Sequence, residues 1–234
     1  NTTILQKSVM MDLKKNKSFV YEQVAQAAAK AGRPASDISI VAVTKYVDSH
    51  VAEQLVNLGV KDIGENRVDK FLDKYQTLKD KDLTWHLIGT LQRRKVKDVI
   101  NYVDYFHALD SVKLAAEIQK RADHTIKCFL QVNVSGEESK HGFSPEQVGS
   151  ALEELASLDK LEIVGLMTMA PITADDRELD EIFKQTNELR QRLKERNIKN
   201  MPFDDLSMGM SRDFPIAISN GSTFVRIGTS FFKE

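Results

Sequence analysis

A lysine that directly follows a short apolar run is the first residue whose chemistry is notable. Lys45 comes after residues 41–44, Val-Ala-Val-Thr. If this run is a strand, the lysine amine lies at its carboxyl end, where partial burial would lower the ammonium pKa and free the amine to attack an aldehyde. The alternative is an ordinary lysine that leaves the strand for solvent, since exposed lysines are the common case.

Two segments rich in small residues lie closer to the C-terminal end. Residues 207–211 are Ser-Met-Gly-Met-Ser, and residues 221–229 are Gly-Ser-Thr-Phe-Val-Arg-Ile-Gly-Thr. In barrels of parallel strands, the loops after the seventh and eighth strands commonly bind phosphate through backbone N–H groups and hydroxyls. Ser211, Gly228 and Thr229 are the natural donors to such an anion.

Three further polar residues fall in or directly after apolar runs. Arg226 interrupts one such run, and a charge facing a barrel interior needs a partner, either a bound cofactor or an Asp or Glu. Asn66 follows residues 61–64, and His86 lies within residues 84–88. Taken alone, Asn66 is more often a helix cap and His86 a hydrogen-bonded core histidine. No metal site is expected, because the five histidines never fall at metal-ligand spacing.

An alternation of short apolar runs and helical patterns must position these residues. A first helix is expected over residues 12–31, before the first strand. Eight strand candidates then alternate with helices, at residues 38–43, 61–64, 84–88, 103–108, 126–134, 161–169, 205–208 and 224–227. This order is typical of βαβ units and a parallel sheet, and a (β/α)8 TIM-like barrel with an extra N-terminal helix fits best. An open doubly wound sheet of six or seven strands is the alternative.

The composition is that of an ordinary globular protein. Its 234 residues carry a formal net charge of −1, so neither nucleic acid nor an anionic membrane is an expected partner. One cysteine, Cys128, cannot form an internal disulfide, and we expect a cytoplasmic protein. No apolar run approaches the roughly 18 to 20 residues that span a bilayer. We expect one domain over residues 12–234, after a segment, 1–11, that is disordered or left from cloning.

A lysine opposite a phosphate site indicates a class of ligand. A phosphorylated aldehyde would use both features, the amine for a Schiff base and the loops for the phosphate. Pyridoxal 5′-phosphate is the leading candidate, because these are its two standard attachments. A barrel enzyme acting on a phosphorylated metabolite without a cofactor stays open, although no carboxylate or histidine pair for such chemistry is evident.

Motifs along nearly the whole chain, from about residue 12, resemble those of the pyridoxal phosphate homeostasis protein family. The Ser-Met-Gly-Met-Ser and Val-Arg-Ile-Gly segments are the most specific; the matching segments are 41–45, 64–66, 85–89 with 91–92, 133–137, 165–167, 206–211 and 221–228. Residues 93–95 and the last residues after Phe231 depart from the family pattern, away from the expected anchors. The resemblance implies the fold-type III barrel of alanine racemase without that enzyme's second β-domain.

The resemblance also assigns residues to the cofactor. It implies an internal aldimine on Lys45, with phosphate contacts from Ser211, Gly228 and Thr229.

Further residues are expected around the ring. The resemblance places Arg226 near the pyridine nitrogen or the phosphate, and Asn66 close to the ring. Met167, Met208 and His86 are expected to line the same pocket. An arginine beside the pyridine nitrogen would leave that nitrogen unprotonated and the ring a weaker electron sink, so carbanion chemistry would be poorly supported.

The function implied by the resemblance is that of a binding protein without a catalytic turnover. It would hold pyridoxal phosphate as a Schiff base, acting in intracellular homeostasis by buffering the cofactor or delivering it to apo-enzymes that depend on it. The alternative is an amino-acid racemase-like enzyme, but racemisation needs acid/base groups on both faces of the cofactor, and Lys45 is the only obvious base. Without the second domain and its dimer contacts, a monomer is expected.

Overall fold

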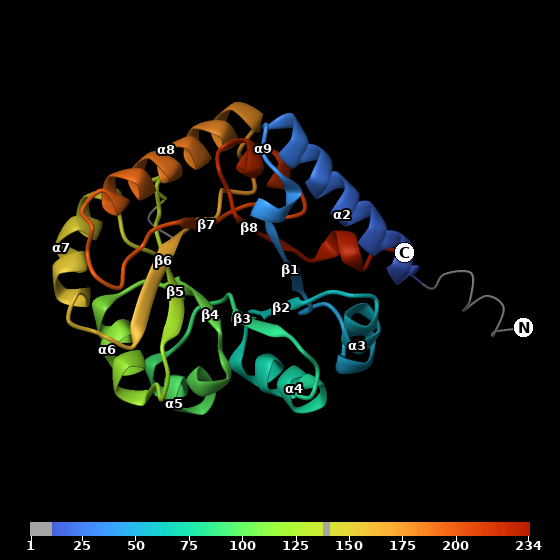
Figure 1. Cartoon of the computed structure of the whole chain (residues 1–234), viewed down its shortest axis with the longest axis horizontal. Coiled ribbons are helices and arrows are strands. Elements are labelled where there is room, and N and C mark those ends of the chain that lie inside the picture. The colour runs from blue at the N-terminus through green and yellow to red at the C-terminus, as the bar shows by residue number, and fades with distance from the viewer. Residues whose placement is uncertain (1–10, 138–140) are drawn as a thin grey trace, which may run out of the picture.

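Eight parallel strands form a closed barrel in the order β1 to β8 (Figure 1). The computed structural model describes residues 11–137 and 141–234, so all but one residue of the segment predicted to be disordered or left from cloning lies outside the described residues. The strands are β1 (Ser39–Val43), β2 (Asp62–Glu65), β3 (Thr84–Leu87), β4 (Tyr105–Leu109), β5 (Ile126–Gln131), β6 (Leu161–Met167), β7 (Asp205–Ser207) and β8 (Phe224–Ile227). The predicted (β/α)8 barrel is confirmed, and the open sheet is excluded.

Helices surround the barrel (Figure 1). They are α2 (Leu13–Lys30), α3 (Ser49–Asn57), α4 (Val68–Leu78), α5 (Val96–Val99), α6 (Val112–Arg121), α7 (Pro145–Leu155), α8 (Asp176–Lys194) and α9 (Phe214–Ser219), with 3-10 turns η1 (Ala35–Asp37), η2 (Arg93–Lys95), η3 (Ile100–Tyr102) and η4 (Thr229–Phe231). Side chains fill the barrel and helices cover its outside, which is why β8 is buried along its whole length.

Local sequence signals set where several helices begin. The Asp48 carboxylate accepts a hydrogen bond from the Val51 N–H at the start of α3. Ser144 and Gln147 form a capping box at the start of α7, with Pro145 at the first helical position. These side chains satisfy N–H groups that have no partner within the helix.

Two elements differ from their predicted extents. Where the alternation of strands and helices predicts one helix between the third and fourth strands, the chain forms η2, α5 and η3, because β-branched Val96, Val99 and Ile100 disfavour a longer helix. The fifth strand ends at Gln131 rather than at residue 134. There the chain leaves the barrel and pairs with Phe143, whose N–H donates to the Gln131 carbonyl.

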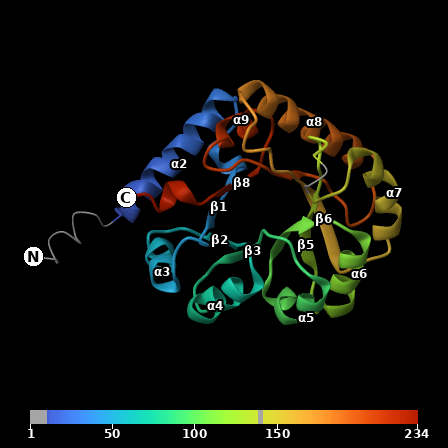
Figure 2. The same cartoon turned by 180° about the vertical axis from the view of Figure 1, so that it is seen from behind.

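Helix α2 completes the ring of helices. Only the short turn η4 follows β8, and α2 packs against α9 and η4, in the place of an eighth outer helix (Figures 1 and 2). Buried Asn16 in α2 donates from Nδ2 to the carbonyls of Phe231, at 2.9 Å, and Lys233, at 2.8 Å. The predicted N-terminal helix is therefore an integral part of the barrel.

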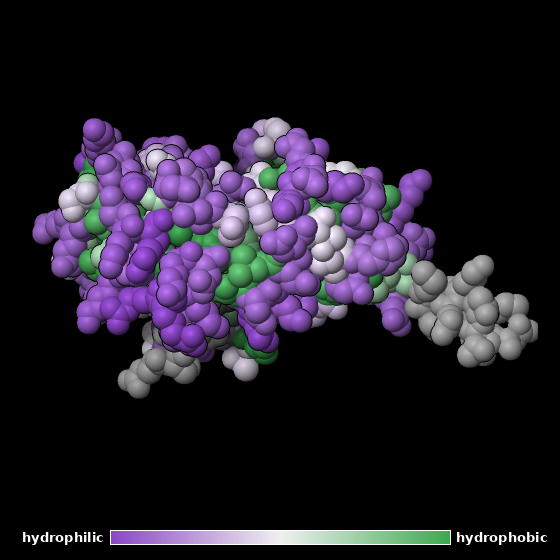
Figure 3. All heavy atoms as spheres, turned by 90° about the horizontal axis from the view of Figure 1, so that it is seen from below, coloured by the Kyte–Doolittle hydropathy of each residue, from purple (hydrophilic) through white to green (hydrophobic). Residues whose placement is uncertain are grey.

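The outer faces of the helices are mainly polar. Figure 3 shows a mostly hydrophilic side of the molecule with smaller apolar areas between charged side chains. Within residues 11–137 and 141–234, no helix is long and apolar enough to cross a membrane.

Candidate functional site

A cavity of about 460 Å³ lies at the carboxyl ends of the strands. Six of the nine predicted site residues line it: Lys45, Asn66, Ser211, Arg226, Gly228 and Thr229. They come from β1, β2, β7 and β8 or the segments that follow those strands, as expected for a parallel barrel. A second cavity of equal volume, at Thr125 and Pro202, has no lysine or arginine among its described lining residues, so it offers neither an amine nor a guanidinium.

Lys45 stands at the mouth of the first cavity, two residues beyond the end of β1. Its Nζ lies 5.1 Å from the centroid of the Tyr46 ring. The residue is exposed, so the partial burial expected from the sequence is not found. The amine is instead open to a ligand entering the cavity from solvent.

A buried ion pair behind Lys45 secures the end of β1. Lys74 in α4 donates from Nζ to Glu65 Oε2, at 2.9 Å, and to the Thr44 carbonyl, at 3.1 Å. The Thr44 hydroxyl donates to the same Glu65 carboxylate. Sequence reasoning missed this pair, although Lys74 sits on the apolar face of α4 between Phe71 and Leu78, where a lysine is unusual.

Asn66 reaches the cavity because two backbone segments approach closely. A Cβ on Gly89 would lie 2.1 Å from the Asn66 carbonyl oxygen, so no other residue fits there without moving the backbone. The Gly64-Glu65-Asn66 and Ile88-Gly89 motifs are therefore one junction between the ends of β2 and β3. The half-buried Asn66 side chain lines the cavity from this junction.

The loop after β7 is shaped by Gly209 and Asp213. Gly209 has φ +105°, in the left-handed region that favours glycine, and its carbonyl accepts a hydrogen bond from the Arg226 N–H at 2.9 Å. Buried Asp213 accepts from the Met210 N–H at 2.7 Å. These bonds hold Ser211 at the cavity, beside β8.

The segment after β8 provides the facing donors. The Ser230 N–H donates to Ser211 Oγ at 3.4 Å, which ties the two loops together. Thr229 begins η4, so its N–H has no partner within that turn. A Cβ on Gly228 would come within 2.7 Å of the Tyr46 ring, so a glycine keeps this wall open. Convergent N–H and hydroxyl groups of this kind can bind an anion.

Arg226 extends from β8 to the base of the cavity and is 3% exposed. Its Nη1 donates to Ser207 Oγ at 2.5 Å, and its Nη2 donates to the Thr168 carbonyl at 3.2 Å. Burial lowers the pKa of Arg226 to about 10, which still leaves it charged at neutral pH. In the described part of the chain, no carboxylate lies within 4.0 Å of its guanidinium. A positive charge without an ion-pair partner therefore faces the cavity.

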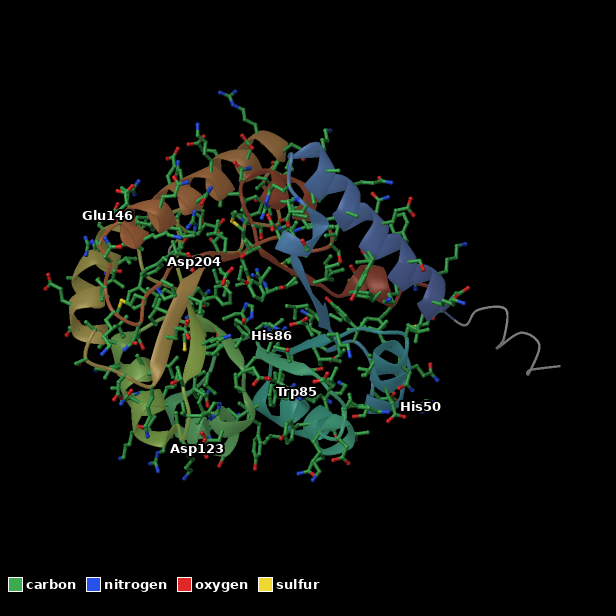
Figure 4. The ribbon with its side chains drawn as sticks, in the orientation of Figure 1. His50, Trp85, His86, Asp123, Glu146 and Asp204 are labelled. Carbon is green, nitrogen blue, oxygen red and sulfur yellow. The ribbon has the colours of Figure 1, made fainter. Side chains whose placement is uncertain are left out.

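Three of the predicted site residues do not line the cavity. His86 lies inside the ring of strands (Figure 4). Its ring nitrogens are hydrogen-bonded to Asp62 and His107. Met167 and Met208 are buried in the apolar core. Met169 and Met210 line the cavity in their place, because the chain continues two residues past each predicted position before it reaches the cavity wall.

The chain is similar to known proteins over almost its whole length. The family model for the alanine racemase N-terminal domain matches residues 17–234. A pyridoxal phosphate homeostasis protein of Aquifex aeolicus is 41% identical over 220 residues, which are 93% of this chain and 96% of that protein. The structure of PipY from Synechococcus elongatus, with pyridoxal phosphate bound, is 31% identical, covers 89% of this chain and 99% of that chain, and has a TM-score of 0.79.

An alanine racemase from Corynebacterium glutamicum is similar in fold alone, at 14% identity with a TM-score of 0.72, over 95% of this chain and 62% of that chain. The closed parallel barrel, the family match and the identity to the Aquifex protein agree with one another. The chain belongs to the alanine racemase N-terminal domain family and, within it, to the pyridoxal phosphate homeostasis proteins.

Proposed function

We propose that this protein binds pyridoxal 5′-phosphate on Lys45 as a Schiff base and serves intracellular homeostasis of that cofactor. The observation that carries the proposal is one cavity that combines an accessible amine, a buried guanidinium with no ion-pair partner among the described residues, and two donor-rich loops. PipY, whose solved structure contains pyridoxal phosphate, supports the same choice of ligand.

The cavity residues fit the parts of this cofactor. When bound, the cofactor would supply an electrophilic aldehyde, and the Lys45 amine would be the nucleophile that holds it. Ser211, Gly228 and Thr229 would hold the phosphate, and Asn66 would lie beside the ring.

Arg226 would face the pyridine nitrogen. A guanidinium donates hydrogen bonds and accepts none, so it keeps that nitrogen in its unprotonated, acceptor form. A neutral ring withdraws electrons weakly, which suits storage of the cofactor better than carbanion chemistry.

The cavity favours a non-catalytic role over a racemase. Its described titratable lining residues are Lys45, Tyr46, Arg212 and Arg226, with no carboxylate or histidine among them. Racemisation requires two acid/base groups on opposite faces of the ring. Lys45 and Tyr46 are neighbours in the chain, and the Lys45 amine lies 5.1 Å from the centroid of the Tyr46 ring.

Delivery to apo-enzymes is the second part of the proposal. Apolar side chains are exposed at the mouth of the cavity, where Ile172 is 85% exposed and Met169 is 39% exposed. Such side chains suit brief contact with an acceptor protein. We expect the chain to act as a monomer, and the single cysteine is compatible with the reducing cytoplasm.

The test is an absorbance spectrum of the protein with added pyridoxal phosphate, before and after borohydride reduction, followed by peptide mapping. We expect one band that reduces to a pyridoxyl group on Lys45, and no adduct in Lys45→Ala. Lys127→Ala is the matched control, because Lys127 lies near Tyr105 outside the cavity and its loss should leave the adduct intact. An adduct that persists in Lys45→Ala contradicts the proposal. So does a folded wild-type protein that forms no adduct.

A further inference from the structure

A linear series of hydrogen-bonded side chains crosses the barrel interior from the cavity to the opposite mouth. We call this series, Arg226, Ser207, His107, His86 and Asp62, the file. Arg226 Nη1 donates to Ser207 Oγ at 2.5 Å, and Ser207 Oγ lies 2.7 Å from His107 Nδ1. His107 Nε2 lies 2.8 Å from His86 Nδ1, and His86 Nε2 lies 2.7 Å from Asp62 Oδ1. The file joins side chains from five strand positions, on β8, β7, β4, β3 and β2.

The chemistry of the two ends sets the direction of every bond in this file. The Asp62 carboxylate only accepts, so His86 Nε2 carries a proton and its Nδ1 is the acceptor in a neutral ring. His107 must then donate from Nε2 and accept at Nδ1 from the Ser207 hydroxyl. Arg226 only donates, and Ser207 Oγ accepts from it. Each member therefore donates to the next, from the guanidinium to the carboxylate.

In this arrangement each imidazole has one N–H donor and one acceptor nitrogen, and both rings are enclosed by the barrel. Each is 0% exposed. The His86 ring stacks on Tyr105 at 4.9 Å, and the His107 ring stacks on Phe129 at 4.6 Å. An apolar environment strengthens each completed hydrogen bond and makes each broken one costly.

The far end of the file is near water. The Asp62 side chain is 23% exposed, whereas the other members are buried. Two other charged groups lie near this mouth: Lys127, whose Nζ is 3.5 Å from the Tyr105 hydroxyl, and Asp205, which accepts from Thr223. Neither bonds to a member of the file, so Asp62 is the terminal acceptor.

We propose that Asp62, His86, His107 and Ser207 are positioning residues for Arg226, forming a one-way relay that holds its guanidinium in one orientation toward the bound cofactor. Two donors of Arg226 are already committed, to Ser207 and Thr168, so the plane of the guanidinium is set before any ligand enters. Its remaining N–H groups are the ones available to the cavity. The inference rests on the proposed function and extends the cofactor site to the opposite mouth of the barrel.

The test compares cofactor dissociation constants from absorbance titrations, together with the position of the bound band and its pH profile. Ser207→Ala should weaken binding roughly tenfold, the value of one charge-assisted hydrogen bond, and shift the pH profile of the band. Ser207→Thr keeps the hydroxyl and should restore both. Asp62→Asn, at the half-exposed end, keeps an acceptor but removes the charge, and should weaken binding by roughly threefold.

Tyr105→Phe is the matched control, since it removes a hydroxyl at the same mouth without touching the file. Its dissociation constant should equal that of the wild type. Thermal unfolding of each apo-variant confirms that the comparison is made on folded protein.

A double-mutant cycle shows whether Ser207 acts through Arg226. Ser207→Ala should have no further effect on the dissociation constant in an Arg226→Ala background, whereas a merely structural role would weaken binding equally in both backgrounds. Equal losses of affinity in the two backgrounds would overturn this inference alone. The same holds if Ser207→Ala and Asp62→Asn bind the cofactor as the wild type does and give the same absorbance band. If the wild type itself forms no reducible adduct, the proposed function is overturned, and this inference with it.

Discussion

At the residue scale, the barrel interior contains polar groups whose protonation matters for folding. Burial, together with the nearby His86 and the charge of Arg226, holds the pKa of His107 well below its usual value of 6.5. In the unfolded chain the same imidazole titrates near 6.5. Below that pH the unfolded state binds a proton that the folded state refuses, so His107 stabilises the fold fully above pH 6.5 and less as the pH falls toward its folded pKa.

We predict that His107→Gln reduces this loss of stability in acid. A glutamine amide does not titrate, yet it has a donor for His86 and an acceptor for Ser207. Between about pH 6.5 and about pH 5, the free energy of unfolding of the wild type should fall more steeply than that of the variant, by at most about 1.4 kcal/mol per pH unit. Urea unfolding at several pH values measures the two slopes. Parallel slopes would show that His107 is protonated as easily in the folded state as in the unfolded state.

At the element scale, the end of β1 that leads to Lys45 depends on a helix. Helix α4 places Lys74 where its ammonium holds both Glu65 and the Thr44 carbonyl, directly before Lys45. Both charged side chains are almost fully buried, at 2% exposure for Lys74 and 0% for Glu65. One carboxylate oxygen of Glu65 has no hydrogen-bond partner among residues 11–137 and 141–234, so this ion pair is only partly satisfied there.

Removing one member of the Lys74–Glu65 pair should therefore lower the free energy of unfolding more than removing both. Lys74→Met leaves the Glu65 charge buried alone and should lower the free energy of unfolding by about 3–5 kcal/mol. The double variant Lys74→Met/Glu65→Gln removes both charges and should recover part of that loss. Chemical denaturation of the two proteins makes the comparison. A double variant less stable than Lys74→Met would mean that the pair is net stabilising.

At the scale of the whole molecule, the first helix supports the last loop. Asn16 bonds to carbonyls of Phe231 and Lys233, and η4 begins at Thr229, a predicted phosphate contact. The stability of the ring and the shape of the site are coupled through this closure between α2 and the C-terminal segment.

Asn16→Ala should test this closure. Two buried carbonyls would lose their donor, at a cost of about 1–3 kcal/mol in the free energy of unfolding. Gln26→Ala, on the same helix, removes an exposed side chain bonded only to Glu22, and should change stability by less than about 0.5 kcal/mol. Equal unfolding midpoints for the two variants would contradict the proposed role of Asn16.

Much of the architecture is encoded locally. The strands and helices follow from apolar periodicity and capping residues, which depend on neighbours a few positions away. Parallel strands then bring their carboxyl ends to one mouth, and for this reason Lys45 and the loops after β7 and β8 could be placed at one site from the sequence. Met167 and Met208, which lie in the core while Met169 and Met210 line the cavity, show the limit, because loop geometry decides which neighbour reaches the cavity.

The contacts that tune the site were decided only by the tertiary structure. His107 and Ser207 are 100 residues apart, and Glu65 meets Lys74 only once α4 covers β2. A single sequence contains the residue types but no measure of which distant strands close the ring, or in which register. Barrel closure sets that register, and with it the buried relay to Arg226. The sequence by itself determined the elements and brought six of the predicted residues to one cavity, whereas packing determined how those residues are held.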